Sequence, residues 1–242
     1  MKKIIITGAS SGVGKCLAER FAEQGEIIYA IARRKEKLDE LARRYPDNIF
    51  PYPADISNAK QVKKAFAEIQ QASPDIEVLI NNASVLNRTL FGQVDFEVID
   101  KSIDINLKGG MYCTYAVLPG MMERKRGYII NIASVAGIPG THWSPPKGLV
   151  AWGDYQASKA GLVGFADFMG KSLRHHNILM TTICPGRIGT EIWEQDGKRV
   201  YLGGEGELLQ PEDIFDLVSF IITRPPRTLY KQVVLFPSSD WH

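Results

Sequence analysis

Tyr155 and Lys159, a tyrosine and a lysine four residues apart, are the pair in this sequence best suited to acid–base chemistry. Residues at this spacing share one face of a helix, so the phenol and the ammonium can lie close together. A cation beside a phenol stabilises the phenolate and lowers the phenol's pKa from its ordinary value of about 10. The pair predicts proton transfer at a carbonyl or alcohol oxygen. The alternative is that both residues lie on a half-exposed helix and have no chemical role, as is usual for this spacing.

A glycine-rich segment at residues 7–14 lies between a β-branched run and an apolar helical pattern. Glycines allow tight turns and close approach to a ligand, and a helix N-terminus offers unpaired N–H groups to a phosphate. A Walker-type phosphate loop is the nearest alternative, but Ala9 and Cys16 stand where that loop requires Gly and Ser or Thr. We therefore expect a dinucleotide pyrophosphate to bind at Gly8, Ser10, Ser11, Gly12, Val13 and Gly14.

Two arginines, Arg33 and Arg34, end the second β-branched run, where an acidic residue normally binds a cofactor that lacks a 2′-phosphate. Guanidinium groups form charge-assisted hydrogen bonds with phosphate, so the pair favours NADP(H) over NAD(H). The alternative is that both arginines only begin a solvated helix at residues 35–44. Asp55 is expected to meet the adenine amino group, with Ile56 beside it.

Short β-branched runs alternate with longer amphipathic stretches along the whole chain. This alternation predicts a single-domain, doubly wound Rossmann fold of the α/β class, with helices on both faces of a parallel sheet. Ser57 is a candidate cap for a helix at residues 59–71, and Pro211 for the start of a helix ending near Thr223. The expected strands are residues 3–7, 26–32, 49–52, 77–81, 127–133, 179–184 and 232–236.

The composition excludes several classes of function. The 242 residues carry 29 basic and 27 acidic side chains, which predicts neither a nucleic-acid surface nor a membrane contact. The apolar run at the N-terminus is too short for a signal peptide. Cys16, Cys113 and Cys184 are odd in number and widely spaced, without metal-binding spacing, which favours free thiols in the cytoplasm.

An ordered set of motifs resembles the short-chain dehydrogenase/reductase family over essentially the whole chain. The set comprises the glycine-rich segment, Asn81-Asn82-Ala83, Asn106, Ser134, Tyr155-x3-Lys159 and Pro185-Gly186-x3-Thr190. The resemblance implies that Tyr155 is the general acid/base, that Ser134 orients the substrate oxygen, and that Asn106 holds a water in a proton relay. It also implies that Lys159 lowers the pKa of Tyr155 and holds the nicotinamide ribose. Further cofactor contacts are implied for Asn82, Ala83, Pro185, Gly186, Ile188 and Thr190.

Two features depart from the family pattern. Ser84 stands where a glycine usually follows the Asn-Asn-Ala motif, which places a side chain near the cofactor. Ser134 and Tyr155 are 21 residues apart, which is longer than usual, so residues 135–154 are predicted to include an inserted loop. This loop and a lid at residues 191–210 are expected to face the substrate. The alternative for the loop is that it contacts a neighbouring subunit or only extends over the surface. The candidate substrate residues are Ser134, His142, Trp143, Trp152, Arg187 and Trp193.

These observations predict an NADP(H)-dependent oxidoreductase that interconverts a ketone or aldehyde and an alcohol. Arg187, His142 and Lys147 could converge on an anion, so we expect a small polar carbonyl compound, including acidic ones, as the substrate. A 3-oxoacyl-thioester reductase and a non-catalytic dinucleotide-binding protein are the alternatives. The resemblance also implies a homotetramer or homodimer built on helices at residues 106–124 and 155–175.

Overall fold

The computed structural model describes residues 1–86, 93–140, 152–195, 198–199 and 208–240. Within these residues a seven-stranded sheet has the order β3-β2-β1-β4-β5-β6-β9, and every neighbouring pair of strands is parallel. The predicted doubly wound α/β fold is therefore confirmed. The strands are β1 (Lys3–Thr7), β2 (Ile27–Ala32), β3 (Ile49–Pro53), β4 (Val78–Asn81), β5 (Gly127–Ile132), β6 (Ile178–Pro185) and β9 (Gln232–Leu235).

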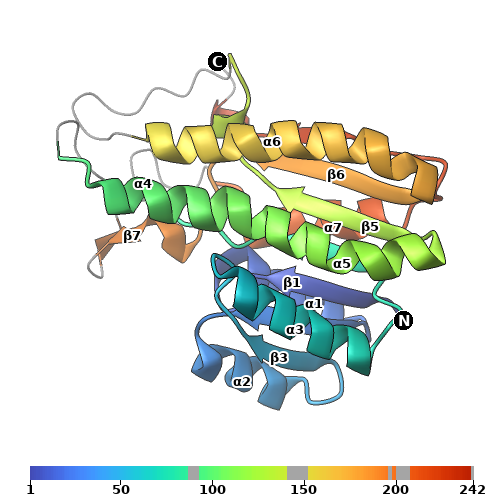
Figure 1. Ribbon diagram of the computed structural model, residues 1–242. Coiled ribbons are helices and arrows are strands. Elements are labelled where there is room, and N and C mark those ends of the chain that lie inside the picture. The colour runs from blue at the N-terminus through green and yellow to red at the C-terminus, as the bar shows by residue number, and fades with distance from the viewer. Residues whose placement is uncertain (87–92, 141–151, 196–197, 200–207, 241–242) are drawn as a thin grey trace.

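Helices cover both faces of the sheet (Figure 1). Helices α3 (Ala59–Ala72), α5 (Gly110–Arg124) and α6 (Gly153–Leu173) pack on one face, and α1 (Gly12–Glu23), α2 (Lys35–Arg44) and α7 (Pro211–Ile222) on the other. Helix α4 (Phe96–Ile103) continues through a π-helical turn, η1 (Asp104–Gly109), directly into α5. The short antiparallel strands β7 (Glu194–Gln195) and β8 (Lys198–Arg199) lie outside the main sheet.

The alternation of side chains along each strand explains why the sheet needs two helical layers. In β1, Ile4 and Ile6 belong to the core beneath α1 and α7, whereas Ile5 belongs to the core beneath α3, α5 and α6. Successive strand residues point to opposite faces, so a strand that is apolar throughout must be covered twice. All three isoleucines are fully buried.

The helix ends agree with the sequence predictions except at α3. The Asn58 side chain, and not that of Ser57, accepts hydrogen bonds from the first-turn N–H groups of Lys60 and Gln61. Ser57 is one residue too early to reach these groups, and its hydroxyl bonds to Asp55 instead. Helix α7 begins at Pro211 as predicted.

The parallel arrangement brings the carboxyl ends of the strands to one edge of the sheet. The chain order reverses between β1 and β4, which is where an open α/β sheet forms its ligand crevice. The segments that follow β1, β4, β5 and β6 therefore lie close together. No helix in the described part of the chain is long and apolar enough to cross a bilayer.

Candidate active site

A cavity of about 890 Å³ opens at the carboxyl ends of the parallel strands. Most of the residues proposed from the sequence line it, although they come from seven separate segments of the chain. His142 and Trp143 lie outside the described residues, as does the side chain of Trp193. Gly14 and Asn106 lie beside the cavity and do not line it. The proposed residues that do line it are Gly8, Ser10, Ser11, Gly12, Val13, Arg33, Arg34, Asp55, Ile56, Asn82, Ala83, Ser134, Trp152, Tyr155, Lys159, Pro185, Gly186, Arg187, Ile188 and Thr190.

The glycine-rich loop brings α1 unusually close to the end of β1. A β-carbon on Gly14 would lie 2.3 Å from the Gly8 carbonyl oxygen, which no side chain can tolerate. Gly14 therefore permits close packing of helix and strand and does not face the ligand. Ser11 precedes the helix, and among the described residues its side chain makes no capping hydrogen bond to the first turn. The N–H groups of that turn are positioned to receive an anion.

Thr7 holds the glycine-rich loop against the segment after β4. Its hydroxyl oxygen accepts hydrogen bonds from the backbone N–H groups of Asn82 at 3.0 Å and Ala83 at 3.1 Å. The Asn82 side chain donates to the Thr7 carbonyl oxygen at 2.9 Å. The sequence prediction included Thr7 in the glycine-rich motif but gave it no role, although a threonine that ends a strand before a glycine turn is a recognisable signal.

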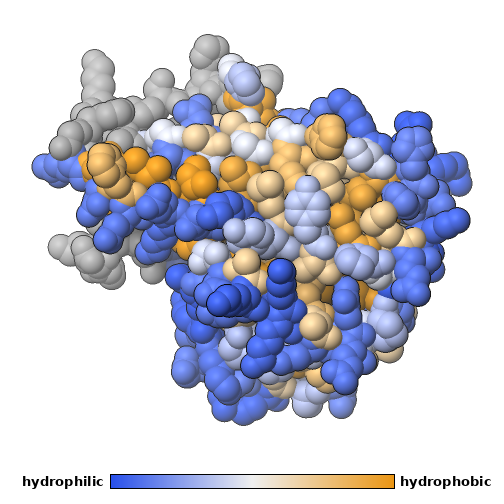
Figure 2. Space-filling view, viewed as in Figure 1, coloured by the Kyte–Doolittle hydropathy of each residue, from blue (hydrophilic) through white to orange (hydrophobic). Residues whose placement is uncertain are grey.

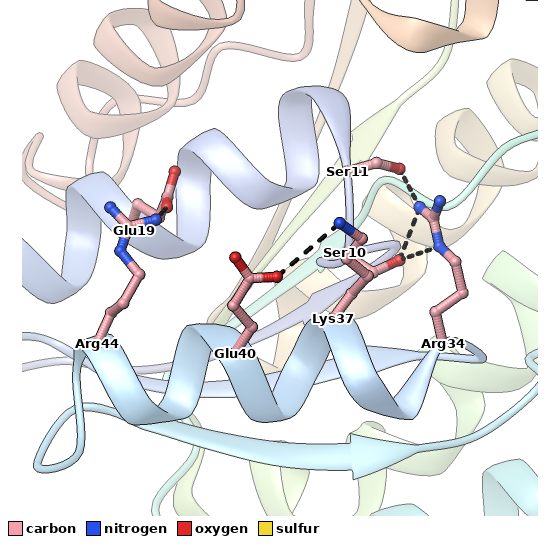
Figure 3. A network of polar contacts seen from close by, with 7 residues as sticks. All are labelled: Ser10, Ser11, Glu19, Arg34, Lys37, Glu40 and Arg44. Carbon is pink, nitrogen blue, oxygen red and sulfur yellow. Dashed lines mark hydrogen bonds and ion pairs between the residues drawn. The ribbon is translucent and has the colours of Figure 1, made fainter. Parts of the chain in front are cut away.

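An arginine and two serines that line the cavity form a polar corner (Figure 3). Arg34 reaches from the start of α2, and its Nε and Nη2 atoms donate to Ser10 Oγ at 3.1 and 3.0 Å. Arg34 Nη2 also contacts Ser11 Oγ. Arg33 is exposed at the same edge. A guanidinium held beside two hydroxyls and a helix N-terminus suits a phosphate group.

Asp55 lies two residues after the end of β3 and lines the cavity. Its Oδ1 atom accepts hydrogen bonds from the Ser57 backbone N–H at 2.9 Å and hydroxyl at 2.7 Å. These bonds hold the carboxylate in one orientation. The position remains suited to the adenine contact predicted from the sequence.

Lys159 is buried on α6 beneath the cavity. Its Nζ atom lies 5.6 Å from the centroid of the Tyr155 ring and donates to the Ile132 carbonyl oxygen at 3.2 Å. Burial lowers the pKa of Lys159 to about 8, with the neighbouring Cys184 acting in the opposite direction. The spacing of four residues thus places phenol and ammonium side by side.

The pKa of Tyr155 differs from the value expected from the family resemblance. Burial raises this pKa above its ordinary value, and hydrogen bonds from Ser134 and Ser84 act against the rise. The expected lowering by Lys159 does not prevail, because the same burial that disfavours a phenolate also disfavours the ammonium. The two serine hydroxyls act against this rise, and the charged Lys159 beside the ring acts in the same direction.

Ser134 is held in place by the turn that follows β5. Its Oγ atom accepts from the Ala136 N–H at 3.1 Å, at the start of the 3₁₀ turn η2 (Val135–Gly137). A β-carbon on Gly137 would lie 2.7 Å from the Lys159 carbonyl group. Only glycine lets η2 pack this closely on α6, so Gly137 sets the separation between Ser134 and the side chains of α6.

Asn106 lies in the π-helical turn η1 and organises the loop after β4. Its Oδ1 atom accepts from the Val85 N–H at 2.7 Å and from the Ser84 hydroxyl at 3.1 Å. Its Nδ2 atom donates to the Val85 carbonyl at 2.9 Å and to Ser158 Oγ at 3.2 Å. Asn106 is thus a positioning residue for residues 84–85, and the water predicted from the family resemblance is not tested.

Further residues of the cavity were not assigned to the site from the sequence, although Ser84 was expected to place a side chain near the cofactor. Val85 directly follows Ser84, so its place after β4 was a usable signal. Phe236 directly follows β9. Because all strands of the parallel sheet end at the same edge, a residue at this position is expected near the cavity. The additional lining residues include Ser84, Val85, Leu86, Ile105, Ile132, Ala136, Ile192, Phe236 and Ser239.

The arrangement can move a proton to or from an oxygen atom. A phenol, two hydroxyls and a buried ammonium line one cavity, and the polar corner formed by Arg34, Ser10 and Ser11 lines it as well. Residues 2–200 match the family model described as short chain dehydrogenase. The chain belongs to the short-chain dehydrogenase family.

Individual relatives extend over nearly the whole chain. An enzyme of Shigella flexneri named NADP-dependent 3-hydroxy acid dehydrogenase YdfG is 33% identical over 241 residues, covering 97% of this chain and 94% of the relative. The closed form of serine dehydrogenase complexed with NADP⁺ is 31% identical with a TM-score of 0.86, covering 98% and 95%. A short-chain dehydrogenase of Sphingobium yanoikuyae in complex with NADPH is 28% identical with a TM-score of 0.79, covering 97% and 87%.

Proposed function

We propose that this protein is an NADP(H)-dependent oxidoreductase that interconverts a small 3-hydroxy acid and the corresponding 3-oxo acid. The predicted reaction class, between hydroxyl and carbonyl groups, is confirmed by membership of the family. The prediction of NADP(H) as the cofactor is confirmed by a relative named as NADP-dependent and by similar structures with NADP⁺ or NADPH. The acidic substrate is the finer part of the proposal.

The position of Arg187 in the cavity is the observation that supports an acidic substrate. Arg187 lines the same cavity as Ser134 and Tyr155 and lies two residues after the end of β6. Its backbone is anchored, because the Arg187 carbonyl accepts from Leu209 N at 3.0 Å and Gly189 N donates to the Leu209 carbonyl at 2.8 Å. A guanidinium on a fixed backbone can bind a carboxylate through two parallel hydrogen bonds.

In the direction of reduction, Tyr155 donates its proton to the substrate oxygen while Ser134 donates a hydrogen bond to the same atom. These two donors stabilise the negative charge that develops on the oxygen. When bound, NADPH supplies the hydride. The ammonium of Lys159, beside the Tyr155 ring, stabilises the phenolate left behind.

The same residues work in reverse during oxidation, where Tyr155 accepts the proton of the alcohol. Arg187 would hold the carboxylate and so fix the hydroxyl-bearing carbon against Ser134 and Tyr155. Trp152 is buried at the start of α6 and lines the cavity. This apolar wall limits the size of the substrate, which favours a small acid over a long acyl thioester.

The proposed substrate class can be tested with acids and their neutral esters. We expect NADP⁺ reduction with L-serine and 3-hydroxybutanoate, and a higher KM for their methyl esters. Arg187→Ala should raise the KM for the acids by roughly 10- to 100-fold, because a charge-assisted hydrogen bond is lost. The KM for the esters should change little.

Two further variants make the test specific to Arg187. Arg187→Lys should recover part of the lost affinity, because it restores the charge without the planar pair of donors. Arg227→Ala removes an exposed arginine that does not line the cavity and should leave both KM values unchanged. Equal effects of Arg187→Ala on acids and esters would remove the carboxylate-binding role.

We also propose a cytoplasmic location and a homo-oligomeric state, neither of which the comparisons address. Cys16, Cys113 and Cys184 are free thiols, which supports a reducing compartment.

The loop at residues 135–154 and the lid at residues 191–210 are also proposed to face the substrate. Residues 141–151, 196–197 and 200–207 of these segments lie outside the described chain.

A further inference from the structure

Ser84 lies between two residues of the proposed acid–base site. It follows β4, is half-buried and lines the cavity. Its Oγ atom donates to Asn106 Oδ1 at 3.1 Å, Asn106 bonds to Ser158, and the Ser158 hydroxyl donates to the Tyr155 carbonyl oxygen. Together with Ser134, the Ser84 hydroxyl also acts to lower the pKa of Tyr155. The serine thus connects Tyr155 on α6 with Asn106 in the π-helical turn.

The hydrogen atoms available in this cluster constrain what Ser84 can do. A serine hydroxyl has one hydrogen and two lone pairs, so it can donate to Asn106 or to Tyr155 but not to both. While Tyr155 is a phenol, Ser84 can donate to Asn106 and accept from the phenol. Once Tyr155 is a phenolate, the serine hydrogen can turn to the charged oxygen.

Asn106 lowers the free-energy cost of turning the Ser84 hydrogen from Asn106 to Tyr155. Its Oδ1 atom also accepts from the Val85 N–H at 2.7 Å, so it keeps a partner when Ser84 turns away. The Asn106 amide is further held by the Val85 carbonyl and by Ser158. A buried acceptor that would otherwise lose its only donor would oppose the change.

We propose that Ser84 is a further catalytic residue, a second hydroxyl donor that stabilises the Tyr155 phenolate during proton transfer. This inference rests on the proposed role of Tyr155 as the general acid/base. A glycine at this position, as the family resemblance leads one to expect, offers no such hydrogen. The asparagine acts through Ser84 by fixing the loop that carries it.

Other charged or titratable groups lie on the elements around Tyr155 or line the same cavity. Lys159 and Asp154 come from α6, and Cys184 comes from β6 beneath Lys159. Arg187 and Glu191 line the cavity beyond β6. Replacing Ser84 by a neutral residue changes none of these charges, so a change in the titration of Tyr155 reports the missing hydroxyl.

The direct test is an ultraviolet titration of the protein with NADP⁺ bound and no substrate. Tyrosinate absorbance is recorded against pH, and the curve of Tyr155→Phe is subtracted to isolate Tyr155. In Ser84→Ala the pKa of Tyr155 should rise by about one unit, because a hydrogen bond to a charged group is lost. An unchanged titration in Ser84→Ala would overturn the proposal.

Three variants separate the hydroxyl from packing. Ser84→Gly should raise the pKa as Ser84→Ala does, and Ser84→Thr, which keeps the hydroxyl, should restore it. Ser102→Ala is the matched control, since Ser102 Oγ contacts Asn106 Nδ2 at 3.4 Å and is fully buried away from the cavity lining. It should leave the titration unchanged. An equal shift in Ser102→Ala would assign the effect to Asn106 and refute the direct role of Ser84.

Turnover gives an independent readout of the same hydrogen bond. For alcohol oxidation, kcat/KM rises with pH as Tyr155 loses its proton. In Ser84→Ala this rise should move to higher pH, with about tenfold lower kcat/KM on the acid side and a similar plateau. Superimposable pH profiles would overturn the inference. If the titration shifts but the wild-type protein oxidises no hydroxy acid, the proposed substrate fails and the role of Ser84 in ionisation stands.

Discussion

At the scale of single residues, we propose that Arg34, together with Arg33, sets the preference for NADP(H). Its guanidinium is held by Ser10 and Ser11 before any ligand arrives. Less side-chain entropy is then lost when a phosphate binds than for a freely moving arginine. Figure 3 shows Arg34 directed at Ser10 and Ser11. Further along α2, Lys37 pairs with Glu40 of the same helix and Arg44 pairs with Glu19 of α1.

Arg34→Ala should weaken NADP⁺ binding by roughly 10- to 100-fold, because charge-assisted hydrogen bonds to the 2′-phosphate are lost. NAD⁺ binding should change little, and Arg33→Asp should reverse or erase the preference for NADP⁺. Lys37→Ala serves as the control, since Lys37 does not line the main cavity. Both dissociation constants can be measured by calorimetry. Unchanged selectivity in both arginine variants would refute the assignment.

At the scale of elements, the site depends on how closely η2 packs on α6. Ser134 is carried by one element, and Tyr155 and Lys159 by the other, so their geometry follows from this single contact. The contact leaves no room for a β-carbon at Gly137. An added methyl group would have to push the two elements apart.

Gly137→Ala should lower the free energy of unfolding by about 1–3 kcal/mol and reduce kcat, because it separates Ser134 from Tyr155. Gly164→Ala is the control on the same helix, where a β-carbon meets no described atom within 4 Å. It should raise stability by up to about 1 kcal/mol. Denaturant unfolding and steady-state kinetics check both variants. Equal losses of stability in the two variants would show that the packing of η2 on α6 does not require glycine at position 137.

The elements also show what the sequence could predict. The apolar strands and the spacing between Tyr155 and Lys159 are local patterns, so the sheet and the pairing on α6 were predicted correctly. The contact of Ser84 with Asn106 and that of Gly137 with Lys159 join distant segments and depend on how loops close. The raised pKa of Tyr155 depends on burial by several segments at once, which no local pattern contains.

At the scale of the whole molecule, α4, α5 and α6 present apolar side chains to solvent. Figure 2 shows apolar residues spread across this face, with polar residues at its two ends. The Phe96 and Phe168 side chains are 80% and 69% exposed, and Tyr115 and Met122 are also exposed. Apolar surface of this kind commonly marks a protein–protein interface.

Light scattering at working concentration should therefore find a homodimer or homotetramer. Phe168→Glu should shift the population towards monomer, because it places a charge within the apolar face. Arg43→Glu introduces the same side chain at an exposed position of α2, on the opposite side of the sheet, and should leave the mass unchanged. A monomeric wild-type protein would contradict the proposed assembly.

The central claim is that Tyr155 exchanges a proton with the substrate oxygen while the rest of the cavity binds NADP(H). The most direct test measures turnover and NADPH affinity side by side for the wild-type protein and Tyr155→Phe. We expect turnover to fall by on the order of 10²–10⁴-fold, since a positioned proton donor is lost, with NADPH affinity nearly unchanged. Turnover close to that of the wild-type protein in Tyr155→Phe would contradict the claim and require a different acid.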